Sequence, residues 1–117
     1  MEEKIKLELV KINTIASDLR NKISNGSIKF AYSEDFPLGC CGVASRILES
    51  ELKKEGFENV RYVNRWREEK SHAWVEYKDY IIDITADQFS GEENEKIIIK
   101  EKNKSDFHKQ FKPGMFN

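Results

Sequence analysis

The stretch that decides the fold covers residues 71–85 and reads SHAWVEYKDYIIDIT. Short stretches rich in apolar residues lie on both sides of Lys78-Asp79, which is typical of two strands joined by a tight turn. We therefore predict a β-hairpin, with one strand from Ser71 to Tyr77 and the next from Tyr80 to Thr85.

The length of the turn decides which side chains share a face of this hairpin. With two residues in the turn, His72 lies opposite Thr85 and Trp74 lies opposite Asp83, so all four side chains point to one face. His72 and Asp83 are then diagonal neighbours, with Cβ atoms roughly 7–8 Å apart. The two polar side chains are therefore expected to meet.

Two helices are expected before the hairpin. Residues 2–24 carry an apolar stripe with spacings of four and three, and Asn25-Gly26 ends that helix. A second helix is predicted from Cys40 or Cys41 to about Glu55, before Gly56. The stripes consist of Ile5, Leu9, Ile12, Ala16, Leu19 and Ile23 in the first helix, and of Ala44, Ile47, Leu48 and Leu52 in the second.

Two further strands complete the predicted sheet. Val60 to about Trp66 shows a period of two, a charged loop follows at residues 67–70, and residues 97–99 form a short apolar run. Residues 27–39, with Pro37 and Gly39, are expected to be irregular. The result is an α+β fold in which both helices pack on a small antiparallel sheet.

The chain length and the C-terminal aromatic residues point to one domain. The 117 residues suit one core, so we expect a single domain over residues 1–117. The tail carries Phe107, Phe111, Met115 and Phe116. Phe107 and Phe111 have helical spacing and are expected to pack on this domain.

Composition excludes several classes of protein. The chain has 20 basic and 21 acidic residues, so its net charge of -1 gives no reason to expect a nucleic acid or a membrane as partner. We find no apolar run of about 18 residues and no secretory signal pattern. The two cysteines, Cys40 and Cys41, are adjacent and cannot staple distant segments, so a reducing, cytoplasmic setting is expected.

A thiol, an imidazole and a carboxylate follow one another in the predicted elements. A cysteine at a helix N-terminus meets the positive end of the helix dipole, which favours the thiolate. A neighbouring His72 favours the thiolate further, and Asp83 on the other ring nitrogen would orient the imidazole. These residue types suit a thiol nucleophile, although each of them also occurs in purely structural roles.

Three motifs in this order carry a family resemblance. Gly39-Cys40-Cys41 opens a helix, Ser71-His72-Ala73-Trp74 opens a strand, and Asp83-Ile84-Thr85 follows on the next strand. Together, over residues 36–89, they resemble the transglutaminase-like branch of the papain-like cysteine protease superfamily. The segment 83–89, DITADQF, is particularly similar to small bacterial single-domain proteins of this branch.

The resemblance implies a papain-like core and a catalytic triad without a metal or an organic cofactor. Cys41 would be the nucleophile, His72 the base and Asp83 the residue that orients the base. The family pattern places Gly-x before the nucleophile, which selects Cys41, with Cys40 as the alternative.

An oxyanion hole is also required, and its second donor stays open. The backbone amide of Cys41 is one candidate donor, and the side chains of Gln88, Trp74 and Tyr32 are the others. We name Trp74 and Gln88 as candidate substrate-binding residues. A zinc site is not expected, because the cysteine pair, His72 and His108 lack the usual ligand spacing.

The sequence therefore predicts a thiol hydrolase that cleaves an amide or peptide bond of a peptide or protein through a thioester. Acyl transfer or glutamine deamidation on the same triad is the alternative reaction. A non-catalytic binding module of the same fold is the alternative from another class.

Overall fold

The computed structural model describes residues 2–89, 91–92 and 95–113. Within these ranges the helices are α1 (Glu2–Ser24), α2 (Cys41–Lys54) and α3 (Asp106–Lys109), and the strands are β1 (Val60–Arg67), β2 (Lys70–Tyr77), β3 (Tyr80–Asp83) and β4 (Ile98–Glu101). Short 3₁₀ turns cover Ser33–Asp35, Ala86–Phe89 and Lys102–Lys104. Met115 and Phe116, expected in the tail, lie outside the described residues.

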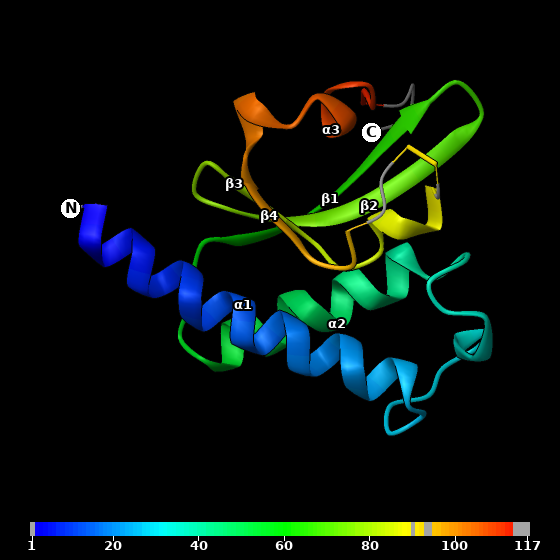
Figure 1. Ribbon diagram of the computed structural model, residues 1–117, viewed down its shortest axis with the longest axis horizontal. Coiled ribbons are helices and arrows are strands. Elements are labelled where there is room, and N and C mark those ends of the chain that lie inside the picture. The colour runs from blue at the N-terminus through cyan, green and yellow to red at the C-terminus, as the bar shows by residue number, and fades with distance from the viewer. Residues whose placement is uncertain (1, 90, 93–94, 114–117) are drawn as a thin grey trace.

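The architecture is α+β, as predicted. The four strands form one antiparallel sheet in the order β1-β2-β3-β4, so each strand pairs with its neighbour in the sequence. Figure 1 shows α1 and α2 side by side on one face of this sheet and α3 on the other face. None of the helices in the described part of the chain combines the length and apolar character needed to cross a membrane.

Both long helices begin and end close to their predicted bounds. Gly26 and Gly56 follow them with φ of 84° and 95°, values that favour glycine and allow the chain to leave the helix. Cys40 is the N-cap of α2, so Cys41 is the first residue of the helix.

Apolar side chains cover both faces of the sheet. The larger core lies between the sheet and the two long helices, and it includes the predicted stripes of both. A smaller core on the opposite face contains Val63, Trp74 and Ile81 from the sheet together with Phe107 and Phe111 from the C-terminal segment. The predicted packing of Phe107 and Phe111 is therefore confirmed, and the hairpin is enclosed on both sides.

The predicted register of the hairpin is confirmed, since Tyr77 pairs with Tyr80 and Val75 with Ile82. The strand ends differ from the prediction in three places. The charged loop 67–70 is a turn of only two residues, because β1 reaches Arg67 and β2 starts at Lys70.

The third strand also ends two residues early, at Asp83 instead of Thr85. The backbone amide of Thr85 donates to Asp83 Oδ1 at 2.9 Å, and this local turn competes with continued strand pairing. The last strand covers Ile98–Glu101, where the sequence predicted residues 97–99.

Candidate active site

The two adjacent cysteines occupy different environments. The Cys40 side chain is buried, and its thiol donates to the carbonyl oxygens of Leu38 at 3.4 Å and Tyr32 at 3.5 Å. Burial raises the pKa of Cys40, helped by the neighbouring Cys41 thiol. Cys41 is only half-buried and begins α2, so the geometry favours Cys41 as the reactive thiol.

The pKa of the Cys41 thiol is lowered from its ordinary value. Burial alone would raise this pKa, but a hydrogen bond with His72 and the charge of that imidazole lower it. The side chain of Gln88 and the backbone of Ala73 add hydrogen bonds that also favour the thiolate. The helix N-terminus and three neighbouring residues thus stabilise a negative charge on this sulfur.

His72 and Asp83 are in contact, as the two-residue turn of the hairpin predicted. The His72 Nε2–H donates to Asp83 Oδ2 at 2.6 Å, and both side chains are fully buried. Burial lowers the pKa of His72, but the charge and hydrogen bond of Asp83, with a smaller contribution from Cys41, raise it to about 9. The imidazole is therefore held as a cation near neutral pH.

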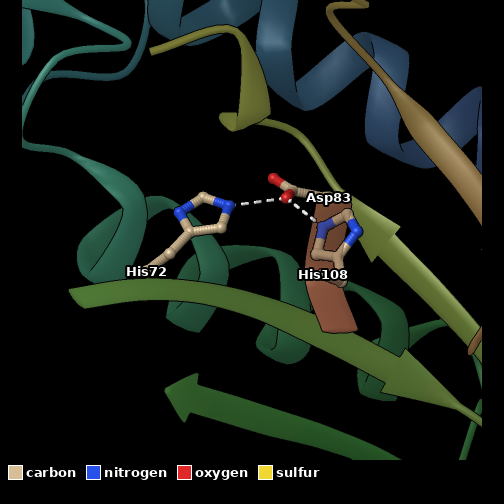
Figure 2. Close-up of side chains that lie close together, drawn as sticks. All are labelled: His72, Asp83 and His108. Atoms are coloured by element: carbon tan, nitrogen blue, oxygen red, sulfur yellow. Dashed lines mark hydrogen bonds and ion pairs between the residues drawn. The ribbon is translucent and has the colours of Figure 1, made fainter. Parts of the chain in front are cut away.

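Asp83 is the centre of a denser network than the sequence predicted. Its Oδ2 also accepts from His108 Nε2 at 2.7 Å, while its Oδ1 accepts from the Thr85 amide. Figure 2 shows His72 and His108 approaching this carboxylate from two sides. Burial raises the pKa of Asp83, but the charge of His72 and the hydrogen bonds from His108 and His72 hold it well below its ordinary value.

His108 is the site residue that sequence reasoning missed. It lies on α3, where Ser105 is the N-cap and the Ser105 hydroxyl is 2.5 Å from His108 Nδ1. Ser105 followed by Asp106 is a helix-start pattern, and it could have drawn attention to this histidine beside Phe107 and Phe111. Nothing in the pattern indicates that α3 folds over Asp83.

The candidate oxyanion and substrate residues differ in their surroundings. The Gln88 amide nitrogen is 3.0 Å from His72 Nδ1, and Gln88 also bonds to Cys41, so Gln88 lies at the reactive edge of the imidazole. Trp74 is buried and its indole N–H donates to Glu76, so its ring packs in the smaller core and its predicted contact with a substrate stays a prediction. The Tyr32 side chain is largely exposed, and only its carbonyl contacts the cysteine pair.

A buried arginine anchors the turn that carries Gln88. The Arg20 guanidinium from α1 binds both carboxylate oxygens of Asp87 at 2.7 Å and donates to the Ile84 carbonyl at 2.8 Å. It also donates to the Lys96 carbonyl at 3.1 Å. Residues on either side of Gln88 are thereby tied to the longest helix, which limits how far Gln88 can move.

His72, Asp83 and His108 also form a group of possible metal ligands in the described part of the chain. Their geometry is that of hydrogen bonds, since both ring nitrogens lie 2.6–2.7 Å from the same oxygen. A metal bound there would have to displace both ring protons in a fully enclosed place. We therefore assign the three residues to a hydrogen-bond chain.

An open groove starts beside the candidate nucleophile and follows the outer side of α2. Tyr62 forms one wall, and the Arg46 guanidinium lies 3.6 Å from the centre of its ring. Burial is the main cause that raises the pKa of Tyr62, and the charge of Cys41 raises it further. The phenol of Tyr62 therefore lies near the thiol. The groove is lined by Gly42, Val43, Arg46, Ile47, Ser50, Glu51, Lys54 and Tyr62.

Comparison with protein-family models, with curated proteins and with solved structures finds no match for this chain. A function therefore has to follow from the chemistry of the side chains themselves. The arrangement offers a stabilised thiolate, a cationic imidazole hydrogen-bonded to it, and a buried carboxylate behind the imidazole. This set of groups suits nucleophilic catalysis at a carbonyl carbon.

Proposed function

We propose that the protein is a cysteine-dependent hydrolase of an amide or peptide bond, of the transglutaminase-like type. One observation carries the proposal: the chain of hydrogen bonds runs from Cys41 through His72 to Asp83. The order of the three groups in the chain and their roles match the general logic of a nucleophile, a base and an orienting acid.

The first half of the reaction uses the thiolate and the imidazolium. Cys41 Sγ attacks the carbonyl carbon of the substrate, and the carbonyl oxygen becomes an oxyanion. The His72 Nδ1–H then protonates the leaving nitrogen, the C–N bond breaks, and a thioester remains on Cys41. Asp83 keeps the Nε2–H of His72 on its far side throughout, so only Nδ1 exchanges protons with the substrate.

The second half uses the imidazole that the first half produced. His72 Nδ1 takes a proton from water, the resulting hydroxide attacks the thioester carbonyl, and the carboxylic acid leaves as Cys41 regains its negative charge. His72 is an imidazolium again at the end. Water is sufficient as the second substrate, so we favour hydrolysis over transfer to an amine.

Gln88 is the proposed side-chain donor of the oxyanion hole. Its amide has two N–H groups, so it can reach Cys41 and a second acceptor at the same time. The resting imidazolium carries a proton on Nδ1, so this nitrogen cannot accept from the Gln88 amide nitrogen 3.0 Å away. The Gln88 N–H therefore needs another acceptor, and the oxyanion beside Cys41 supplies one.

The groove along α2 gives the substrate a place to lie. Gly42 is at its start, directly after Cys41, and Val43 and Ile47 give it apolar character. Arg46 supplies a cation that lies over the ring of Tyr62. We propose that this groove holds one side of a peptide chain whose scissile carbonyl lies over Cys41.

The rate of alkylation by iodoacetamide, followed by mass spectrometry across a pH series, tests the proposal. We expect Cys41 to react well below its ordinary thiol pKa, as its lowered pKa requires, and faster than a cysteine in a short peptide. Cys40→Ser is the matched control and should leave this rate unchanged, whereas Cys41→Ser should abolish it. Labelling that starts at Cys40, or only near the ordinary thiol pKa, contradicts the proposal and favours the binding module.

The reaction type is tested on peptide amides by trapping the thioester. An acyl group attached to Cys41, lost again in water, supports hydrolysis. If added hydroxylamine raises turnover and appears in the product, transfer to an amine is the better description. If no amide forms a thioester on a rapidly alkylated Cys41, the proposed amide substrate class is wrong.

A further inference from the structure

His108 lies at the far end of the hydrogen-bond chain, and none of the steps above uses it. It comes from α3, while its acceptor Asp83 ends β3 and the other donor, His72, comes from β2. The two imidazoles share one carboxylate oxygen, as Figure 2 shows. A second histidine on the same oxygen requires an explanation, because His72 and Thr85 already donate to this carboxylate.

The positions of the protons on His108 follow from its neighbours. A carboxylate only accepts, so the nitrogen facing Asp83, Nε2, carries a hydrogen. The other nitrogen, Nδ1, is then free to accept the hydrogen of the Ser105 hydroxyl at 2.5 Å. Ser105 and His108 are both buried, at 2% and 3% exposed, so this arrangement keeps one N–H directed at Asp83.

The chemistry of the site explains what such a donor does. Asp83 is fully buried, and a buried carboxylate needs hydrogen-bond donors or a positive charge nearby. During the reaction His72 alternates between imidazolium and neutral imidazole, so the positive charge beside Asp83 comes and goes. The N–H of His108 stays in place through the whole cycle.

We propose that His108 is a positioning residue of the thiol site: held by Ser105, it donates to Asp83 throughout the cycle and thereby makes it easier for His72 to release its proton. Without this donor, Asp83 would depend more strongly on the imidazolium, and His72 would keep its proton more tightly. The inference rests on the proposed function, because the proton-transfer role of His72 is taken from it.

Few other charged groups face this network. Asp83 is faced by His72 and His108, and His72 is faced by Cys41 from α2. Arg65 is the cross-strand neighbour of His72 on β1, and its guanidinium donates to the backbone carbonyl of Asn64. Aromatic rings fill the remaining surroundings, so changes at residue 108 should act on His72 mainly through Asp83.

A packing role is the competing explanation for His108. Its ring lies 4.7 Å from the ring of Trp74 and 5.1 Å from that of Phe107, between centroids, so it fills space in the smaller core. Two substitutions separate packing from hydrogen bonding. His108→Leu keeps an apolar side chain of similar size and removes the donor, whereas His108→Gln keeps an N–H of similar reach.

The test is the titration of His72, followed by NMR of its carbon-bound ring protons. The chain has two histidines, so each variant at residue 108 leaves His72 as the only histidine signal. All proteins carry Cys41→Ser, so that a titrating thiol does not overlap with the imidazole. We expect His108→Leu to raise the midpoint by about one pH unit, which is a tenfold higher proton affinity. His108→Gln should stay within about 0.3 of the protein with His108.

The outcomes that overturn the inference are distinct. If His108→Leu leaves the midpoint unchanged or lowers it, His108 does not ease proton release. If His108→Gln moves the midpoint as far as His108→Leu, packing alone explains the residue. If His108→Leu fails to fold, Ser105→Ala gives the same test, because it removes the hydroxyl that is hydrogen-bonded to Nδ1 of the His108 ring and orients this ring. It should raise the midpoint by a smaller amount, and no rise overturns the inference.

Failure of this inference can be told apart from failure of the proposed function. If Cys41 is alkylated rapidly but the titration midpoint of His72 is the same in all variants, the hydrolase proposal stands and the proposed role of His108 is wrong. If Cys41 is alkylated slowly but His108→Leu and His108→Gln shift the midpoint of His72 as expected, the coupling through Asp83 is supported and the hydrolase proposal is wrong.

Discussion

Replacing Asp83 by asparagine should destabilise the protein by an amount that depends on pH. Asp83 is buried and accepts from His72, His108 and the Thr85 amide. Asparagine has a similar shape, but it has no charge and only one acceptor oxygen, so its own N–H groups must face either an imidazole N–H or the Thr85 amide N–H. Removing one partner of a buried ion pair costs roughly 3–5 kcal/mol.

His72 supplies the pH dependence of this cost. Its folded-state pKa is about 9 against an ordinary value of 6.5, a difference that corresponds to roughly 3 kcal/mol. Because the folded pKa is raised, this stabilisation is fully present below about pH 6.5 and is lost as the pH rises through about 9. The lowered pKa of Asp83 acts at the acid end, where its stabilisation is lost as the pH falls below 3.8.

The assay is urea unfolding followed by tryptophan fluorescence at about pH 6 and about pH 10. Both proteins carry Cys41→Ser, because the lowered pKa of the thiol would add stability toward alkaline pH. Since Cys41 supplies part of the raised pKa of His72, we expect the cost of Asp83→Asn to fall by roughly 2 kcal/mol between the two pH values.

An exposed aspartate in the adjoining turn provides the control. Asp79→Asn should change the free energy of unfolding by less than about 0.5 kcal/mol at either pH. An equal cost of Asp83→Asn at both pH values would refute the reasoning. In that case His72 does not gain its proton affinity from Asp83, and the site lacks the ion pair that the mechanism needs.

Four further substitutions probe the two thiols and the turn that carries Gln88. Cys41→Ala should have a melting temperature close to that of the wild type because Cys41 is half-buried, whereas Cys40→Ala should melt at a lower temperature because Cys40 is buried. Thermal unfolding of both variants measures this difference, and the reverse order contradicts the assignment of Cys41 as the nucleophile. Gln88→Leu should raise the pKa of the Cys41 thiol, since Gln88 lowers it, and an unchanged alkylation profile would remove Gln88 from the site. Arg20→Met should cost roughly 3 kcal/mol or more in urea unfolding, because it leaves Asp87 without its paired charge, and a cost below about 1 kcal/mol would show that the pair is not an anchor.

The hairpin and its polar pair were predictable because they depend on local information. Lys78-Asp79 sets the turn, and alternation along two short strands fixes which side chains share a face. Once the register is known, the meeting of His72 and Asp83 follows from strand geometry alone. The choice of Cys41 over Cys40 was not local in this sense: it came from the family pattern of Gly-x before the nucleophile, because the sequence left the first residue of the helix open between the two.

The contacts made by the C-terminal segment were not predictable in this way. His108 meets Asp83 from 25 positions further along the chain, and no periodic pattern links the two residues. Trp74 shares a face with His72, as predicted, but the same face is covered by α3, so the indole packs in the smaller core. Alternation tells which residues share a face of a sheet, but not what later covers that face.

The burial of the network explains why the C-terminal segment matters for the proposed chemistry. Cys41 is half-buried, while His72, Asp83 and His108 are enclosed, so a substrate can reach only the sulfur end of the chain. Among buried side chains, the strength of each charge depends on the protein groups that face it.

Those groups stay in place only while the C-terminal segment is docked on the sheet. Two backbone hydrogen bonds of 2.7 Å between Trp66 and Lys112 attach it to β1, and Arg67 donates to Gln110 at 3.0 Å. Local unfolding of this segment would expose Asp83 to water and remove the hydrogen bond that His108 donates to Asp83, while Cys41 would stay at the start of α2. The charge state of His72 is therefore coupled to the docking of a segment that contributes no group to the bond-breaking steps.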